Sequence, residues 1–338
     1  ALQNIYVDEG NPYYSSLDGV LCNKIGDTIL YCPTGRTGVY TVPAGVTTIG
    51  VDAFNACVNL TELVIPNFVT TIEEGAFSSC SGLVTVTFEG GGNSELIIGD
   101  SVFSSCRNLK NVIFADGCRV STIGADAFYR CTALESIKIP SGVNSIGAGA
   151  FEDCTLLSEI VFAENGTDLT IGDAAFDGCT ALKTITLPAY ISEISSGVFT
   201  GCTNLEGVKV DPDNPNYADL DGVLFDKNYT TLLYYSYAMP EEYVVPETVT
   251  TIEDAVFKGN KNLRKITIGK NVTSIGASAF SNCINLSEVI FEAGGTEPLT
   301  FGNYAFEYCS SLTEFIFPDR ASVTGNYMFR FAEGLERV

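Results

Sequence analysis

The sequence predicts an α/β solenoid: a right-handed superhelix of short coils, with a parallel β-sheet on one face and β-hairpin modules within it. Two observations lead to this prediction. A unit of about 23 residues recurs along nearly the whole 338-residue chain. A second, longer unit occurs twice, with corresponding residues such as Ile5 and Val208 separated by 203 positions.

The short unit is clearest around residues 123–146. Its apolar and small residues stand at Ile123, Gly124, Ala127, Phe128, Cys131, Leu134, Ile137, Ile139, Pro140, Val143 and then Ile146. Alternation at Ile137 and Ile139 predicts a short strand with both side chains on the buried face. Pro140 has no N–H for a ladder, so it should end the strand. We expect Ala127, Phe128 and Cys131 in a short helical or 3₁₀ segment on the far side.

The first aliphatic position of the unit recurs with little variation. It falls at Ile49, Ile72, Ile98, Ile123, Ile146, Ile171, Ile194, Ile252, Ile275 and Phe301. Most intervals are 23 residues, whereas those of 25 or 26 residues carry extra residues after the strand, such as Gly90–Gly92. One such coil cannot bury its apolar stripe alone, so the coils should stack around one continuous core.

The longer unit predicts β-hairpins. Asp18-Gly19 and Asp221-Gly222 each lie between a leucine and a valine, which is typical of a tight hairpin turn. A second turn should follow near Lys24 and Lys227. We therefore expect one solenoid over 1–338, with hairpin modules at about 1–48 and 205–251 and regular coils at about 49–204 and 252–338. The chain opens and closes in mid-coil, so we expect the native protein to extend beyond one or both ends.

The composition excludes several classes of function. Asp and Glu outnumber Lys and Arg by 41 to 18, which gives a formal charge of −23 and disfavours nucleic acid as a partner. No apolar stretch is long enough for a membrane span. There is no histidine, which removes the commonest general base and metal ligand.

These repeats resemble the BspA-like, or Treponema-type, leucine-rich repeats. The resemblance rests on the Ile-Gly-x-x-Ala-Phe-x-x-Cys-x-x-Leu unit and the Asn-Pro-x-Tyr…Asp-Gly-Val-Leu module, and it covers essentially the whole chain. It implies a secreted or surface-attached protein of anaerobic or host-associated bacteria, with relatives in parasitic protists. It also implies adhesion to host matrix proteins or to other microbes, and it supplies no catalytic residues.

Nine cysteines hold one position of the unit. They are Cys57, Cys80, Cys106, Cys131, Cys154, Cys179, Cys202, Cys283 and Cys309. A metal or redox ladder is one interpretation, but Asn260 and Ala332 occupy the same position and no Cys-x-x-Cys pair exists. We therefore expect free, buried thiols that fill the core. Cys22 and Cys32 replace an aromatic pair of the second module, and both a disulfide and a core substitution remain open.

The remaining motifs carry little chemistry. Asp211, Asp213 and Asn214 resemble a calcium loop but lack the glycine and the distal glutamate of an EF-hand, so a turn built from their side chains is favoured. Motifs for a phosphate-binding loop or a serine nucleophile are absent. We expect no enzyme activity, no cofactor and no bound metal.

The strand side chains that face away from the core form the predicted binding surface. Its central column consists of Val64, Thr87, Ile113, Lys138, Val161, Thr186, Lys209, Thr267, Ile290 and Ile316. β-branched residues suit strands for their own sake, yet a partly apolar exposed column is also typical of a partner surface. The tyrosine-rich hairpins, with Tyr234 and Tyr235, are a rival site.

The sequence thus predicts a non-enzymatic, secreted or cell-surface scaffold for protein binding or adhesion. Its expected partner is a host matrix protein or another microbial surface protein. The alternative is a glycan-binding or passive spacer segment of a larger cell-surface protein.

Overall fold

The structure, a computed structural model, describes residues 1–338 and contains two compact units. Unit 1 comprises residues 1–181 and 192–198, and unit 2 comprises residues 182–191 and 199–338. Each unit is a stack of coils joined by parallel strand pairing, a parallel β-solenoid. All regular elements are strands. The structure contains no helix that is long and apolar enough to cross a membrane. That 1–338 form a single solenoid stays a prediction.

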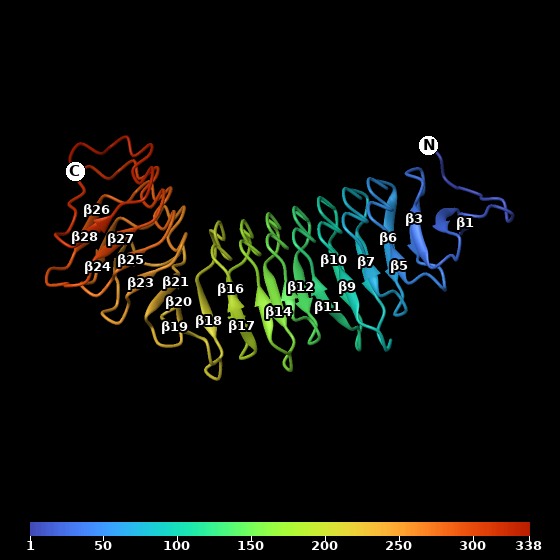
Figure 1. Cartoon of the computed structure of the whole chain (residues 1–338), viewed down its shortest axis with the longest axis horizontal. Coiled ribbons are helices and arrows are strands. Elements are labelled where there is room, and N and C mark those ends of the chain that lie inside the picture. Colours follow the sequence, from blue (N-terminus) through green and yellow to red (C-terminus); the bar gives the residue numbers. More distant parts are fainter. The chain divides into compact units, whose positions relative to one another are not determined.

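Unit 1 has two sets of β-sheets, and a regular coil contributes one strand to each set (Figure 1). The first set is one ten-stranded sheet, with the order β1 (Tyr14–Leu17), β2 (Val20–Asn23), β3 (Thr28–Tyr31), β5 (Thr48–Ile49), β7 (Thr71–Ile72), β9 (Leu96–Ile98), β11 (Val120–Ile123), β13 (Ser145–Ile146), β15 (Leu169–Ile171) and β17 (Ile191–Ile194). The second set, here called the strand face, has a four-stranded sheet of β4 (Gly38–Thr41), β6 (Leu60–Ile65), β8 (Thr85–Phe88) and β10 (Asn111–Phe114), and a pair of β12 (Ser136–Ile139) and β14 (Glu159–Phe162).

Unit 2 has the same two sets of sheets. Its seven-stranded sheet has the order β19 (Tyr217–Leu220), β20 (Val223–Asp226), β21 (Thr231–Tyr234), β23 (Thr251–Ile252), β25 (Ser274–Ile275), β27 (Leu299–Phe301) and β28 (Ala321–Val323). Its strand face has a pair of β16 (Thr184–Leu187) and β18 (Gly207–Val210), and a three-stranded sheet of β22 (Glu242–Val244), β24 (Lys265–Ile268) and β26 (Glu288–Phe291).

The strand predicted from the Ile-x-Ile alternation is confirmed in β12. Ile137 and Ile139 are buried, whereas Ser136 and Lys138 between them are exposed. β12 and β14 pair in parallel with Ile137 opposite Ile160. The ten-stranded and seven-stranded sheets were not predicted, because their regular strands contain only two to four residues, too few to show a period.

The predicted helical or 3₁₀ segment is wrong, since the Ala-Phe-x-x-Cys stretch consists of turns. Asp126 and Arg130 have φ angles of 54° and 57°, a left-handed conformation that a right-handed helix cannot continue. Hydrogen bonds alternate along the stretch: the Tyr129 N–H donates within the coil to the Asp126 carbonyl, and the Phe128 N–H donates to the Ala150 carbonyl of the next coil. The far side is therefore a third line of bonds between coils.

The hairpin modules have the predicted turns. Asp18 and Gly19 have φ angles of 45° and 75°, and Asp221 and Gly222 have φ angles of 52° and 86°. Two consecutive positive φ angles are what a two-residue hairpin turn needs to match the twist of its strands. β1 and β2 are antiparallel, as are β19 and β20, and the third strand of each module joins the parallel ladder.

The strand face is interrupted where a long coil precedes a short one. The coils of β8 and β10 span 26 and 25 residues (Ile72 to Ile98 and Ile98 to Ile123), and these strands pair. The coil of β12 spans 23 residues, and β12 belongs to a different sheet from β10. On the other side of the same coils, β9, β11 and β13 pair without a break. The predicted parallel sheet on the strand face is present, but it is divided where a longer coil is followed by a shorter one.

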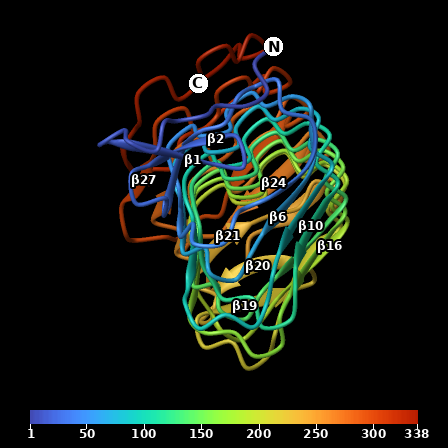
Figure 2. The same cartoon turned by 90° about the vertical axis from the view of Figure 1, so that its right-hand side faces the viewer.

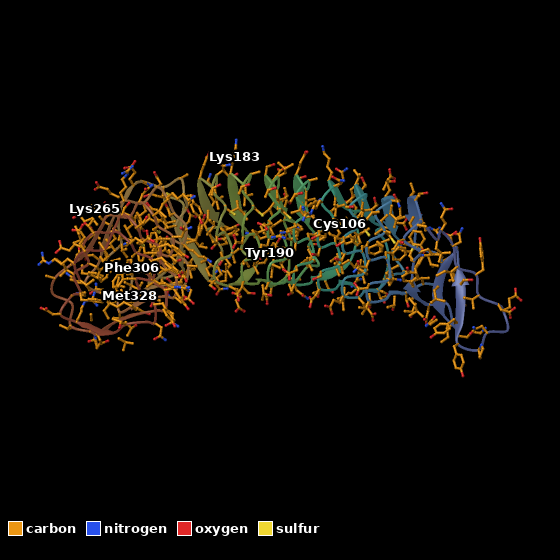
Figure 3. All side chains as sticks on the ribbon, turned by 90° about the horizontal axis from the view of Figure 1, so that it is seen from above. Cys106, Lys183, Tyr190, Lys265, Phe306 and Met328 are labelled. Atoms are coloured by element: carbon orange, nitrogen blue, oxygen red, sulfur yellow. The ribbon has the colours of Figure 1, made fainter.

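The core is a stack of equivalent side chains, one from each coil. Seen along the stack, the coils of unit 1 project onto one another (Figure 2). Phe128 stacks on Phe103 and Phe151 with ring centroids 5.3 and 5.1 Å apart, and Phe280 of unit 2 stacks on Phe306 at 4.9 Å. Cys106 and Phe306 lie inside their units, whereas Lys183 points outward (Figure 3).

Phe128→Ala should lower the free energy of unfolding by about 3–5 kcal/mol, because it removes two ring contacts and leaves a cavity in the stack. Val161→Ala, at an exposed position, should cost less than about 1 kcal/mol. Urea denaturation of both variants measures the difference. Equal effects would contradict the assignment of Phe128 to the core.

Candidate binding surfaces

The structure places the predicted column on the outer side of the strand face. Its residues in unit 1 are Val64, Thr87, Ile113, Lys138 and Val161, and those in unit 2 are Thr186, Lys209, Thr267, Ile290 and Ile316. Ile113, Val161 and Ile316 are 47%, 42% and 63% exposed. Lys138, Thr186 and Lys209 are also exposed, while the other four are half-buried.

Strand pairing brings some column members together and separates others. Thr87 lies opposite both Val64 and Ile113, so these three form one continuous row in unit 1. Lys138 lies opposite Val161, Thr186 opposite Lys209, and Thr267 opposite Ile290. The row stops after Ile113 and after Ile290, because the ladder breaks there. The column is therefore a set of short patches.

The prediction that Tyr234 and Tyr235 form an exposed surface is wrong. Tyr234 is 6% exposed and Tyr235 is 1% exposed. The Tyr235 ring packs 5.0 Å from Phe257, its hydroxyl donates to the Pro240 carbonyl at 2.9 Å, and burial raises its pKa. These two tyrosines fill the core where regular coils place phenylalanine. The most exposed tyrosines of the two modules belong to the first, where Tyr6 and Tyr13 are 84% and 74% exposed.

A cluster of four surface aromatic residues in the last two coils, three of them exposed and Tyr304 half-buried, was missed. Tyr304 stacks on Tyr327 at 5.4 Å, and Tyr308 stacks on Phe331 at 4.8 Å. Arg330 lies over Phe331 at 4.6 Å. The four rings occupy left-handed backbone positions, which bulky residues rarely adopt. The signal was available, because none of the corresponding positions in the other coils holds an aromatic residue; they hold Asp, Ser, Ala, Gly, Asn or Arg.

A groove of about 620 Å³ opens on the strand face of unit 2. One wall is β26 with the residues that follow it, and the other is the segment 313–320 of the next coil. Ile290 and Ile316 of the predicted column lie on opposite walls. The groove coincides with a step from a 26-residue coil (Ile275 to Phe301) to a shorter one, as at the break after β10.

The predicted cysteine ladder consists of buried side chains, and none of the twelve cysteines forms a disulfide. The Cys131 thiol donates to the Phe103 carbonyl of the preceding coil at 3.2 Å, and Cys154 donates in the same way to Phe128 at 3.2 Å. Burial raises the pKa of Cys131 well above its ordinary value and that of Cys309 to about 12. Such thiols are poor nucleophiles and poor metal ligands, because both roles need the thiolate.

Cys22 and Cys32 are core substitutions in this structure. Both are buried, and their strands pair Cys22 with Ile29 and Leu21 with Tyr31, so the two cysteines are not opposite each other. The Cys32 thiol lies near the carbonyl of Pro33 at 3.7 Å. Of the two interpretations that the sequence left open, the structure has the one without a bridge.

The segment that resembles a calcium loop is a pair of turns. The Asp211 carboxylate accepts the Asp213 N–H at 2.9 Å, and the Asn214 side-chain oxygen accepts the Asn216 and Tyr217 N–H groups. The Asn214 amide also donates to two carbonyls of the preceding coil, those of Pro188 and Ile191. These oxygens are committed to the backbone, and no group of three or more Cys, Asp or Glu side chains is placed to hold a metal ion.

Comparison with known families fits this geometry. A model described as the BspA-type leucine-rich repeat region matches residues 23–120, 121–220 and 231–338 in six copies. The chain belongs to the BspA-type leucine-rich repeat family. Among curated proteins, no sequence matches this BspA-type chain.

Three solved structures of bacterial proteins have a similar fold. A leucine-rich cell surface protein from Faecalibacterium prausnitzii is 26% identical, with a TM-score of 0.78 over 97% of this BspA-type chain and 88% of its own. The pneumococcal vaccine antigen PcpA is 22% identical, with a TM-score of 0.69 over 95% of this chain and 78% of its own. A leucine-rich repeat protein from Bacteroides ovatus is 23% identical, with a TM-score of 0.56 over 95% of this chain and 91% of its own.

Titration of thiols should find at least nine reactive groups in denaturant without reductant, and all twelve if every cysteine is reduced. In the native protein at pH 8 the ladder thiols should stay unreactive, because they are buried away from the reagent. The half-buried Cys118 is an internal comparison and should react first. Recovery of three groups or fewer in denaturant would mean that the ladder is oxidised.

Stability should fall as the pH rises above about 9. The folded pKa values of thiols such as Cys131 and Cys283 are raised, so the unfolded chain releases protons that the folded chain keeps. The free energy of unfolding then decreases by up to about 1.4 kcal/mol per pH unit for each such thiol. Thermal melts from pH 6 to 10 measure this: a flat profile below pH 8 and a shallower alkaline decline in Cys131→Ser are expected. An unchanged melting temperature at pH 10 would contradict it.

Proposed function

We propose that this chain is a non-enzymatic scaffold of the bacterial cell surface that binds a protein partner through its strand face. The observation that carries the proposal is the outward row of Val64, Thr87 and Ile113, three cross-strand neighbours that present apolar side chains and methyl groups to solvent. Contiguous exposed apolar patches on a rigid surface are characteristic of partner sites. The similarity to a protein named as a cell surface protein supports the location.

The architecture supports binding over catalysis. The outward side chains on the strand face are held by strands that are bonded to neighbouring coils, so the surface loses little conformational freedom when a partner docks. The ladder cysteines are buried in the core, and Cys131 and Cys154, for example, donate to carbonyls of the preceding coil. A host matrix protein or another microbial surface protein is the expected partner.

Exposed aliphatic side chains are the anchors of the proposed surface in unit 1. Burial of apolar area contributes about 25 cal/mol per Å², and a few residues commonly supply most of the binding energy. Ile113 is the largest apolar residue of its row, and its side chain is 47% exposed. In the next sheet Val161, which lies opposite Lys138, is 42% exposed. A partner that covers both patches removes both side chains from water.

A glycan-binding or spacer role is the second candidate. The exposed rings of Tyr327 and Phe331 in the last coils favour it, because they present amphipathic and apolar surface away from the strand face. Binding to a glycan array that is lost in a Tyr327→Ala/Phe331→Ala variant would favour this candidate over a protein partner.

Ile113→Asp combined with Val161→Asp should abolish capture of host matrix proteins or bacterial surface proteins in a pull-down, because each carboxylate must be desolvated in the interface. The melting temperature should change little, since both positions face outward. Val58→Asp with Leu156→Asp is the matched control: these residues are 46% and 52% exposed but lie outside the strands. Normal capture by the first variant would show that this surface does not bind, and its unfolding would show a wrong register.

A further inference from the structure

One edge of β26 is unpaired. β26 pairs in parallel with β24, with Lys265 opposite Glu288 and Ile268 opposite Phe291, and it is the last strand of its sheet. The next coil continues with residues 313–317, but no backbone hydrogen bond joins them to β26. An exposed strand edge with free N–H and C=O groups is a template for another strand.

The direction of the existing bonds shows which groups are free. The Glu288 and Glu292 N–H groups donate to the Arg264 and Ile268 carbonyls, so both point toward β24. In a parallel ladder successive residues bond to opposite sides, and the N–H and C=O groups of Val289 and Phe291 therefore face the groove. On the other wall the Phe315 N–H donates to the Arg337 carbonyl, so the backbone groups of Glu314 and Ile316 face back into the groove.

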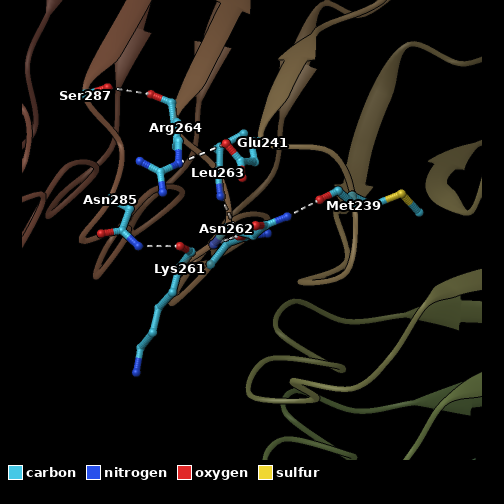
Figure 4. A network of polar contacts seen from close by, with 9 residues as sticks. Met239, Glu241, Lys261, Asn262, Leu263, Arg264, Asn285 and Ser287 are labelled. Carbon is cyan, nitrogen blue, oxygen red and sulfur yellow. Dashed lines mark hydrogen bonds and ion pairs between the residues drawn. The ribbon is translucent and has the colours of Figure 1, made fainter.

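The wall formed by β26 is held firmly on its other side. Besides the ladder, the Ser287 hydroxyl donates to the Arg264 carbonyl at 3.2 Å, and the Asn285 amide donates to the Lys261 carbonyl at 2.6 Å (Figure 4). Arg264 also pairs with Glu241 at 2.9 Å. An incoming strand would meet an edge that is already ordered, which limits the entropy lost on binding.

The inner end of the groove is apolar. Phe291 lines the groove, and its ring packs against the buried Phe315 ring with 5.7 Å between centroids. Val289, Phe291 and Phe317 are half-buried, and Ile316 is 63% exposed. Aliphatic side chains of a bound strand would cover these surfaces.

The rim is acidic. Glu288 pairs with Lys265 and Glu314 pairs with Arg337, both at 2.9 Å, while Glu292 and Asp319 have no basic partner. The basic residue of the lining, Arg320, directs its guanidinium to the Val272 and Gly269 carbonyls, which lie two coils earlier, after β24. With a net chain charge of −23, the field at the groove favours a cationic ligand.

We propose that this groove binds an extended segment of a partner protein by strand addition, and that the segment alternates basic with β-branched residues. The N–H and C=O groups of Val289 and Phe291 pair with its backbone. Its aliphatic side chains contact Ile316 and Phe317, and its basic side chains lie beside Glu292 and Asp319. The inference rests on the proposed protein-binding function and adds a second binding site, in unit 2.

The test uses a fluorescent, end-capped peptide of eight residues that alternates lysine with valine, and it measures anisotropy with the full chain. The wild-type protein should bind it, and the same peptide N-methylated at alternate residues should bind at least tenfold more weakly, because N-methylation removes the paired N–H groups. A peptide with glutamate in place of lysine should not bind. Equal affinity of the methylated peptide, or no binding of the parent peptide, would overturn the proposal.

Charge reversal locates the site. Glu292→Lys with Asp319→Lys should raise the Kd for the parent peptide at least tenfold. Glu247→Lys with Glu333→Lys makes the same charge change at exposed positions outside the lining and should leave it within twofold. Equal effects of the two variants would overturn the groove as the site. A concentration-dependent dimer that only the first variant disrupts would assign the groove to a second copy of the chain instead.

Binding of the peptide to the groove should not depend on the proposed surface in unit 1. Ile113→Asp with Val161→Asp should bind the peptide as the wild type does. If that variant loses natural partners yet keeps the peptide, the proposed function stands on the strand face of unit 1 and the groove is an additional site. If the peptide fails while natural partners still depend on Ile113 and Val161, the inference fails and the proposed function survives.

Discussion

Each coil depends on its neighbours for its backbone hydrogen bonds. A coil of this kind contains neither a helix nor, outside the two modules, a hairpin, so many of its backbone N–H and C=O groups find their partner in a neighbouring coil. The Phe128 N–H is satisfied by Ala150 of the next coil, and the Gly124 N–H by Ile98 of the preceding one. The coils must therefore stack at a fixed register, and this requirement explains why the same residue types recur at the same positions of each coil.

The cysteine and phenylalanine positions are consequences of that register. The carbonyl of Phe103 points toward the next coil. The Cys131 thiol of that coil lies beside it and donates a hydrogen bond to it. In unit 2 the Asn260 amide does the same for the Ser236 carbonyl at 3.1 Å. A small donor fits that place, which explains why asparagine can replace cysteine at this position.

The sequence predicted those parts of the fold that local chemistry determines. Ile137 and Ile139 had to share a face, and Asp18-Gly19 had to turn tightly. The return strand Thr48–Ile49 escaped detection because two residues show no period, and its pairing with Thr71–Ile72 is a property of the stack. Tyr234 and Tyr235 were misplaced because tyrosine suits both a core and a surface. The groove depends on a difference in length between two successive coils, which no single coil reveals.

The bonds between coils also bear on how so long a chain reaches its native state. Each bond from a ladder thiol to a phenylalanine carbonyl joins residues only 26 to 29 positions apart, as in Cys80 to Phe54 and Cys106 to Phe77. Closing a loop of that size costs little more entropy than closing a hairpin half as long. Any few adjacent coils can therefore nucleate, and growth proceeds from either end by adding one coil at a time. The kinetics of folding should depend on the local cluster of coils and hardly at all on the number of repeats.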